Sequence, residues 1–323
     1  MELLFLGTSA GVPTRGRNVS ATALLPANRK GWCLVDCGEG TQHQVLRTPL
    51  SLHDLDAVFI THVHGDHCFG LPGLFSSAGM SGRTRPLKLV APAALEPWLA
   101  MTLEVSHSTL PFEVEFQAVE SFGGVAVAEW SVTTLALSHR VPCWAYVFTE
   151  AKPEPRLDVQ RLAAEGIPRG ALWGQLAQGQ TVVWQGRLLQ GNDYRLAGRM
   201  AQRVVICGDN DTPALLREAC GQAQVLVHEA TYTQSVLEAG KQGYGHSSAQ
   251  AVARMAEQAG LANLVLTHFS PRYQAAGGSG ASIDDIRQEA AAAYRGRLWL
   301  ARDLAHYRLA RNGLLEAVAP PPG

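Results

Sequence analysis

The sequence lacks a strong net charge, closely paired cysteines and any long apolar run. Its 323 residues carry a formal net charge of −1, so no global basic field surrounds the protein, and a nucleic-acid partner would need a local positive surface. None of the 6 cysteines forms a C-x-x-C pair, which favours buried reduced thiols over disulfides or a cysteine zinc site. No run reaches transmembrane length, and the apolar residues after Met1 and Glu2 are too few for a signal-peptide core. We therefore expect a soluble, intracellular protein with no membrane association.

What the sequence does contain is a regular succession of apolar runs. Hydrophobic residues make up 46% of the chain, which supports a sizeable core and argues against disorder. Runs such as 2–6, 203–207 and 263–266 predict strands, and helical segments such as 93–102 and 249–259 lie between them. Strands with interspersed helices predict an α/β or α+β protein whose layers stack around two sheets.

Residues 150–199 differ in character from the rest of the chain. Apolar residues are fewer, glycine, proline and glutamine are more frequent, and basic residues outnumber acidic ones. We expect a short helix at 156–165 and a hairpin at 181–189. The segment is either an arm inserted into the core or an ordinary surface subdomain with a solvated charged face, and composition alone favours the second.

A dense cluster of metal-ligand residues occupies the stretch Thr61–His67. Four potential ligands fall within six residues and follow the apolar run 57–60, which predicts a buried strand: His62, His64, Asp66 and His67. Alternate strand residues share a face, so the first two would project together, and Gly65 would permit a sharp turn that returns the other two. Imidazole suits zinc and carboxylate adds an oxygen ligand. So many ligands exceed what one tetrahedral ion takes from one turn, and the motif predicts two adjacent metals in a hydrolase.

Other ligand-type residues follow apolar strands elsewhere in the chain, namely His139, Asp209, His228 and His268. Because ligands gather at the C-terminal ends of strands in α/β proteins, three of them are candidates to complete the two metal spheres: His139, Asp209 and His268. We expect one metal to bind His62, His64 and His139. We expect the other to bind Asp66, His67 and His268, with Asp209 bridging the two.

Two carboxylates near this cluster leave alternatives open. Asp211 is a rival to Asp209, although Asp209 directly follows the strand and Gly208. Asp36 also ends a predicted strand, where it either orients a ligand histidine or serves as a buried capping carboxylate.

Several stretches carry a resemblance to a known family: Phe5–Pro13, Arg17-Asn18, Asp36–Gln44, His62–His67, Phe69–Gly73, His228–Thr231, Gly245–Ser248 and Thr267–Tyr273. They resemble ribonuclease Z, whose bacterial short form is also called ribonuclease BN. The metal motif alone marks only the metallo-β-lactamase superfamily, whereas the last three stretches together are far more specific. The resemblance runs nearly from end to end of the chain.

This resemblance implies a fold, an activity and partners. The fold would be a four-layer αβ/βα sandwich, the metallo-β-lactamase fold, as one domain over residues 1–323 with a flexible arm at 150–197 that grips tRNA. The enzyme would be a cytoplasmic homodimer with two Zn²⁺ per chain, although carboxylates also tolerate Mn²⁺ or Fe²⁺. It would cleave the 3′ trailer from precursor tRNA and leave a 3′-hydroxyl on the tRNA.

The resemblance also implies roles for single residues. Asp66 would orient the attacking water, and His246 would donate a proton to the leaving 3′-oxygen while Glu229 positions it, unless Glu229 only caps a helix. Substrate contacts are implied for Arg15, Arg17, Asn18, His228, Arg272 and Tyr273, of which His228 alternatively only structures the site. The sequence departs from the family pattern at Asn210, where threonine is usual, and at Gly170-Ala171, where the arm usually carries Gly-Pro.

Two other functions compete with this one. A small-molecule phosphodiesterase of the same fold would share the metal motif but would have no reason to keep a basic arm. A catalytically silent tRNA-binding protein would have lost ligands, whereas this ligand set is intact.

Overall fold

The computed structural model describes residues 1–27, 30–153, 156–196, 198–240, 244–274 and 280–319. The chain divides into a first unit, Met1–Thr149 with Arg203–Gly323, and a second unit, Glu150–Gln202. The second unit is therefore inserted between two halves of the first, over nearly the segment 150–197 that the resemblance marks as an arm.

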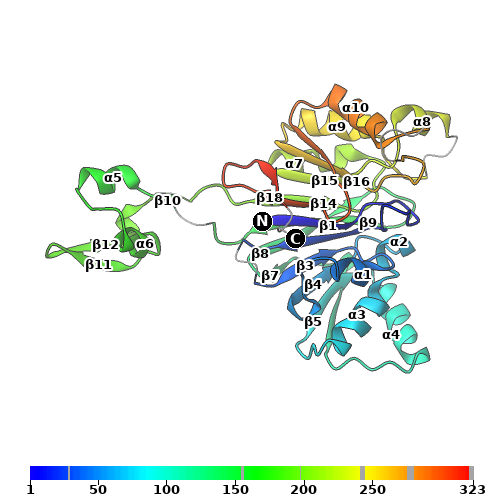
Figure 1. Ribbon diagram of the computed structural model, residues 1–323, viewed down its shortest axis with the longest axis horizontal. Coiled ribbons are helices and arrows are strands. Elements are labelled where there is room, and N and C mark those ends of the chain that lie inside the picture. Colours follow the sequence, from blue (N-terminus) through cyan, green and yellow to red (C-terminus); the bar gives the residue numbers. More distant parts are fainter. Residues whose placement is uncertain (28–29, 154–155, 197, 241–243, 275–279, 320–323) are drawn as a thin grey trace. The chain divides into compact units, whose positions relative to one another are not determined.

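The first sheet of the first unit has eight strands in the order β19-β18-β1-β2-β3-β4-β5-β6 (Figure 1). Its strands are β1 (Glu2–Gly7), β2 (Ala21–Leu25), β3 (Trp32–Val35), β4 (Leu55–Phe59), β5 (Leu87–Ala91), β6 (Val114–Ala118), β18 (His306–Leu309) and β19 (Leu315–Ala317). The strands from β3 to β6 run parallel, and the others pair antiparallel. The carboxyl ends of β3 and β4 therefore meet at one edge.

The second sheet has seven strands in the order β17-β16-β15-β14-β9-β8-β7. Its strands are β7 (Val125–Val127), β8 (Trp130–Leu137), β9 (Cys143–Glu150), β14 (Arg203–Cys207), β15 (Val225–Glu229), β16 (Asn263–Thr267) and β17 (Arg297–Leu300). The strands from β14 to β17 run parallel, so their carboxyl ends also share an edge.

Helices cover the outer face of each sheet (Figure 1). On the first sheet lie α1 (Thr41–Val45), α3 (Leu71–Met80) and α4 (Leu95–Val105), and on the second lie α7 (Arg217–Gly221), α9 (Ala249–Gln258) and α10 (Ile283–Ala293). The remaining helical segments of this unit are α2 (Gly65–Cys68), α8 (Gln234–Ala239), η1 (Leu52–Asp54), η2 (Val119–Ser121) and η4 (Pro213–Leu216). Ser282 caps α10 with a capping box, and Ser248 caps α9. Helix, sheet, sheet and helix layers confirm the predicted αβ/βα sandwich.

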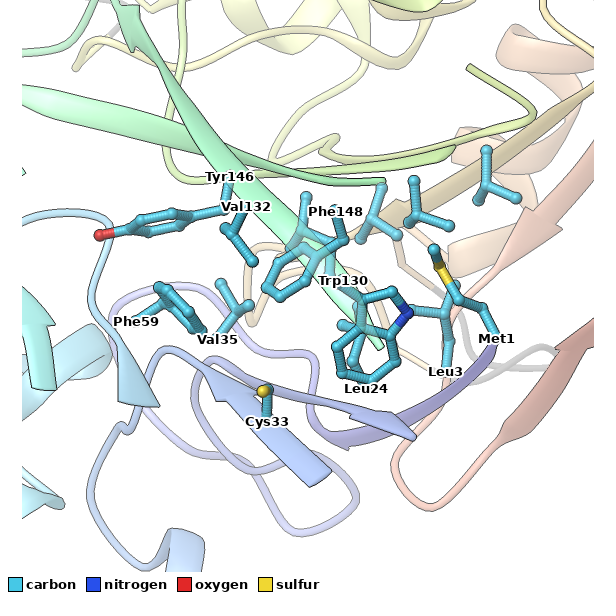
Figure 2. Close-up of a cluster of buried hydrophobic side chains, with 14 of the residues drawn as sticks. Met1, Leu3, Leu24, Cys33, Val35, Phe59, Trp130, Val132, Tyr146 and Phe148 are labelled. Atoms are coloured by element: carbon cyan, nitrogen blue, oxygen red, sulfur yellow. The ribbon is translucent and has the colours of Figure 1, made fainter. Parts of the chain in front are cut away.

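Alternation along the strands explains the stacking. Val35 and Phe59 face the core between the two sheets, whereas Leu34 and Val58 face the helices outside. In Figure 2 the Phe59 ring points toward Tyr146 and Phe148 of the opposite sheet, with ring centroids 5.0 and 5.3 Å away. Because both faces of central strands such as β3 and β14 are buried, these strands are continuous apolar runs, whereas the more peripheral strands β6 and β8 keep partly exposed polar residues.

The second unit has a small core of its own. Two short helices, α5 (Val159–Ala164) and α6 (Ala171–Ala177), accompany a hairpin of β11 (Thr181–Trp184) and β12 (Arg187–Gln190), a pair of β10 (Arg156–Leu157) with β13 (Arg195–Leu196), and η3 (Gly191–Tyr194). The hairpin confirms the prediction for 181–189. The helix expected at 156–165 is shorter, because Arg156 and Leu157 are in a strand, and α6 was not predicted. The core residues are Leu162, Ile167, Leu176, Val182, Leu189 and Tyr194.

Two strand boundaries differ from the prediction. β4 ends at Phe59, so His62 and His64 lie on a loop rather than on alternate positions of a strand. β15 continues to Glu229, so His228 lies inside the sheet instead of following the strand. Both differences are of the one or two residues by which strand ends usually vary.

The cysteines and helices agree with the composition. All six cysteines, each in the described part of the chain, are buried and outside any disulfide, which confirms the prediction of reduced thiols. No helix in the described residues is both long and apolar enough to cross a membrane.

Truncation of Phe59 tests the contact between the two sheets. Phe59→Ala should lower the free energy of unfolding by about 3–5 kcal/mol, because the cavity lies between two sheets that cannot close around it. Chemical denaturation measures this change. Met80→Ala, at a side chain that is 91% exposed, should change stability by less than about 0.5 kcal/mol. Equal losses in the two variants would contradict this account of the core.

Candidate metal centre

The loop between β4 and α2 carries four of the predicted ligands. Thr61 anchors its start, because its N–H and its hydroxyl donate to the two oxygens of Asp36 at 2.8 and 3.0 Å. The helical turn α2 begins at Gly65, where a Cβ would lie 2.3 Å from the Phe69 ring. Glycine leaves room for the exposed Phe69 ring, and its φ is not in the left-handed region, so the sharp turn that the sequence suggested does not depend on it.

A first group of ligand atoms gathers around His64. Its Nδ1 lies 3.1 Å from His62 Nε2 and 3.2 Å from His139 Nε2. Asp209 Oδ2 lies 3.6 and 3.7 Å from the same two Nε2 atoms. The four ligand atoms are close enough to one another to hold one metal ion.

A second group lies on the other oxygen of the same aspartate. His67 Nε2 and His268 Nε2 are 3.3 Å apart, and they lie 3.5 and 3.3 Å from Asp66 Oδ2. Asp209 Oδ1 is 3.5 Å from His67 Nε2 and 3.4 Å from His268 Nε2. The structure thus brings together all seven predicted ligands in the two predicted groups, with Asp209 between them. The rival Asp211 is exposed and belongs to neither group.

Two further buried carboxylates fix the outer sides of the histidines. Asp36 accepts from His67 Nδ1 at 2.7 Å and holds Thr61, whose hydroxyl oxygen is 3.0 Å from His62 Nδ1. The structure thus places Asp36 as an orienting group for ligand histidines. On the other sheet, the Thr231 hydroxyl donates to Glu229 and lies 2.9 Å from His268 Nδ1.

These outer contacts show that the ligand set fits metal ions. His139 Nδ1 also donates outward, to the carbonyl of Gly245 at 2.7 Å. With Nδ1 bonded outside, the Nε2 atoms of these histidines face the centre and offer lone pairs to a metal when the imidazoles are neutral, as metal-bound imidazoles do. Asp209 is 3% exposed, and in the described residues no group donates a hydrogen bond to its Oδ1. A buried carboxylate oxygen with no hydrogen-bond donor is matched by a cation.

The pKa shifts point the same way. Burial lowers the pKa of three ligand imidazoles, and so favours the neutral form that metals bind, in His62, His64 and His139. Burial acts likewise on His67, but the three surrounding carboxylates outweigh it and raise the pKa of His67 to about 10. Burial opposes ionisation of Asp66, yet the charge of His67 and the bond to His268 hold the pKa of Asp66 well below its usual range. The potential that stabilises an imidazolium here would equally stabilise a metal cation.

His246 lies beside this cluster and is held by Glu229. His246 Nδ1 is 3.1 Å from Glu229 Oε1, and Glu229 is buried and also accepts the backbone N–H groups of Asn210 and Ser247. Burial opposes the charged imidazole, but Glu229 and then Asp209 raise the pKa of His246 to about 9. His246 Nδ1 could also join a metal group with Asp209 and His268, but its bond to Glu229 favours a role in proton transfer.

A cleft of about 400 Å³ opens over the ligand atoms. Its lining includes Asp66, Asp209, His246, the Phe69 ring and the exposed Arg140. A substrate in this cleft would touch both ligand groups and His246 together.

The predicted substrate contacts fall into two classes. Arg15 and Arg272 are exposed, and the Arg272 guanidinium lies over the Tyr232 ring at 5.2 Å. Arg17 instead donates to the carbonyl oxygens of Ser270 and Tyr273, at 3.4 and 2.6 Å, and so ties two loops together.

Three other predicted contacts are internal. The Tyr273 side chain is fully buried with its hydroxyl accepting from the Thr233 N–H, so it offers RNA no surface. His228 is also fully buried: its Nδ1 donates to the Glu229 carbonyl, and its Nε2 accepts from Asn210. The Asn18 amide donates to the carbonyl of Glu39.

Sequence reasoning missed residues whose partners are distant in the chain. The Gly11 N–H donates to Asp66 Oδ2 at 2.7 Å, and Asp303 accepts from Thr8, Asn18 and Gln44. Asp303 thereby holds the loop that presents Gly11. An acid three residues after a predicted strand was the available signal for Asp303.

Asn210, the departure from the family pattern, joins strand ends of the second sheet. Its side-chain oxygen accepts from the Ser138 N–H at 3.2 Å, and its Nδ2 donates to His228 at 3.0 Å. The Asn210 side chain therefore links the chain after β8 to His228 in β15, next to the predicted ligand Asp209.

Sequence comparison finds close relatives over the whole chain. A ribonuclease Z of Pseudomonas putida is 61% identical over 318 residues, which cover 98% of this chain and 99% of that protein. A family model described as anti-Pycsar protein Apyc1 matches residues 1–137, less than half of the chain.

Comparison with solved structures shows the metallo-β-lactamase fold. Human tRNase Z, short form, is 24% identical with a TM-score of 0.63, covering 95% of this chain and 98% of that chain. The metallo-β-lactamase fold protein YhfI of Bacillus subtilis is 17% identical with a TM-score of 0.65, covering 94% of this chain and 98% of that chain.

Loss of the Asp36 charge tests the outer hydrogen bonds of the ligands. Asp36→Asn should weaken metal binding roughly 10–100-fold, because His67 loses the acceptor that fixes its Nδ1–H. Equilibrium dialysis with metal analysis measures the affinity. Asp54→Asn, which removes an exposed carboxylate in η1, should leave it unchanged. Equal affinities in the Asp36→Asn variant and the unchanged protein would contradict the orienting role.

Proposed function

The chain belongs to the ribonuclease Z family, and from that premise we propose that it is a zinc-dependent endoribonuclease that removes the 3′ trailer from precursor tRNA. The tRNA product would carry a 3′-hydroxyl. The observation that carries this proposal is the single carboxylate of Asp209 between two ligand groups, with His246 held beside both. We place the enzyme in the cytoplasm, where precursor tRNA is processed.

The ligand chemistry supports zinc. Five imidazoles and two carboxylates would hold the ions: His62, His64 and His139 in one group, Asp66, His67 and His268 in the other, and Asp209 in both. Imidazole-rich sites suit Zn²⁺, while the carboxylates would also accept Mn²⁺ or Fe²⁺. Bound metal would supply Lewis-acid activation of water and neutralise charge on the phosphate.

The chain's own residues would orient the reactants. Asp66 accepts the Gly11 N–H on Oδ2 and can accept a hydrogen bond from the attacking water beside it. His246, with its ring fixed by Glu229, would give a proton to the departing 3′-oxygen as the bond from phosphorus to that oxygen breaks. Glu229 is a positioning residue, because it acts on the substrate only through His246.

The second unit would bind the body of the tRNA. Several of its arginines are engaged internally: Arg161 and Arg187 pair with Glu165, and Arg199 pairs with Glu150. Arg156 and Arg169 are exposed, and the Arg169 guanidinium lies over the Trp173 ring. Exposed guanidinium groups suit phosphate contacts, which position an RNA without reading its sequence.

A homodimer is part of the same proposal. Large apolar side chains stand exposed on or next to the helices of the first sheet: Leu46, Phe69, Met80, Met101 and Val105. Exposed apolar side chains on one helical layer are surface that a second copy could cover.

Cleavage of two substrates by one variant tests the chemistry. The enzyme with zinc should cut a labelled precursor tRNA once, directly after the last tRNA nucleotide, and His246→Ala should lower kcat/KM roughly 10²–10⁴-fold. On bis(4-nitrophenyl) phosphate the same variant should lose far less of its kcat/KM. The nitrophenolate leaving group departs without needing a proton. Single-turnover rates on both substrates measure the difference.

Controls separate the competing functions. His43→Ala, at an exposed histidine of α1, should leave both rates unchanged. Hydrolysis of the chromogenic diester with no cleavage of precursor tRNA would favour a small-molecule phosphodiesterase. Binding of tRNA without bound metal and without either reaction would favour a silent tRNA-binding protein.

Charge removal tests the second unit. The double variant Arg156→Ala with Arg169→Ala should raise KM for precursor tRNA and reduce the salt slope of log kcat/KM by roughly 2, about 1 per lost phosphate contact. Hydrolysis of bis(4-nitrophenyl) phosphate should not change. The double variant Arg254→Ala with Arg295→Ala, at two exposed arginines of the first unit, serves as the charge-matched control. An unchanged salt slope in the double variant would remove the second unit from tRNA binding.

A further inference from the structure

A second cavity, of about 300 Å³, lies along α8, and its lining residue Tyr232 contacts the His246 ring. It is lined by residues of α8 and of the flanking loops, among them Tyr232, Val236, Leu237, Ala239, Tyr244 and Arg272. Its volume is at the lower end of the range for small-ligand sites, about 300–1,000 Å³. None of the described residues that line this cavity is a metal ligand, so the cavity is distinct from the metal groups.

The lining has the chemistry of a base-stacking site. Two aromatic rings and two aliphatic side chains give flat apolar surface, and among the lining residues that the structure describes none is acidic. The Arg272 guanidinium lies 5.2 Å from the centroid of the Tyr232 ring, so a cation covers one end of the aromatic surface. Proteins hold unpaired bases between aromatic rings and arginine planes in this way.

The cavity is separated from the proposed proton donor, His246, by the Tyr232 ring alone. The Tyr232 and His246 ring centroids are 6.0 Å apart, edge to face. Tyr232 directly follows Thr231, whose hydroxyl contacts both Glu229 and His268. Only a nucleotide that flanks the scissile phosphate could therefore place its base in the cavity while that phosphate lies over the ligand atoms.

The direction of cleavage decides which of the two flanking nucleotides that is. In the proposed reaction, water forms a new bond to phosphorus, the bond from phosphorus to O3′ breaks, and O3′ takes its proton from His246. The trailer keeps the phosphate at its 5′ end. The ribose that carries O3′ must lie against His246, so its own base is the one nearest to Tyr232.

We propose that the cavity at Tyr232 and Arg272 binds the base of the nucleotide immediately 5′ of the scissile phosphate, which is the last nucleotide that the tRNA retains. This inference rests on the proposed function. Stacking tolerates every base, because each base has an aromatic face. The cavity therefore fixes the position of the cut through the placement of one unpaired base without requiring a particular base.

Removal of one base at a time tests this assignment. A precursor tRNA that is abasic at the nucleotide 5′ of the cut should lose roughly tenfold in kcat/KM with the unchanged enzyme, the size of one stacking contact. Tyr232→Leu should lower kcat/KM for the intact substrate by a similar factor. For this variant, removal of the base should lower kcat/KM no further. Ala239→Phe, which adds a ring to the exposed wall of the cavity, should behave the same way and guards against misfolding of the Tyr232 variant.

The controls distinguish the cavity from the reaction. Ser235→Phe adds the same ring to α8 at an exposed position outside the cavity lining, and it should respond to the abasic substrate as the unchanged enzyme does. A substrate that is abasic at the first trailer nucleotide should affect all four proteins equally. The proposal is overturned if removal of the base 5′ of the cut lowers kcat/KM as much in Tyr232→Leu and Ala239→Phe as in the unchanged enzyme. It is also overturned if removal of the first trailer base affects these two variants and the unchanged enzyme differently. Failure of the unchanged enzyme to cut the intact precursor would instead overturn the proposed function itself.

Discussion

The carboxylate of Asp209 lies between two groups of imidazoles, with Oδ2 toward His62 and His139 and Oδ1 toward His67 and His268. Removal of such a charge from water costs several kcal/mol unless opposite charge or hydrogen bonds compensate. In the described residues no hydrogen bond reaches Oδ1, so positive charge has to compensate, either on the His67 imidazole, whose pKa the carboxylates raise, or on a metal ion. The site is therefore balanced when a cation lies on each side of the carboxylate.

The layered fold decides where such a cluster can form. The central strands of both sheets are buried on both faces, and the seven predicted ligands lie after strand ends. Asp209 lies two residues after β14, His139 two after β8, and His268 directly after β16. A Cβ at Gly208 would lie 2.6 Å from Thr61 and from Cys143, so the end of β14 packs tightly on the loop that carries the metal motif. The apolar packing of the two sheets thus brings the ligands to one point.

The stacked layers and the two groups of ligand residues could be predicted from the sequence. The layers follow from the apolar runs, and the ligands are the polar residues that directly follow those runs. It was insufficient for contacts that depend on the direction of one side chain. His64 presents Nδ1 where its neighbours present Nε2, and Arg17 and Tyr273 turn inward although loop residues of these types commonly meet RNA. Asp303 bonds to Thr8 across 295 positions, and no local pattern predicts such a pairing. The order of the strands in each sheet has the same cause, since β18 pairs with β1 from the opposite end of the chain.

The two orienting carboxylates repeat one arrangement on the two sheets. Asp36, after β3, holds one histidine directly and a second through the hydroxyl of Thr61. Glu229, at the end of β15, holds His246 directly and His268 through the hydroxyl of Thr231. In each case one buried acid fixes two imidazoles, so its loss would disturb both, and substitutions within a set would not add. Because His246 and His268 share Glu229, the orientation of the proposed proton donor and the geometry of the candidate metal group are set by the same carboxylate.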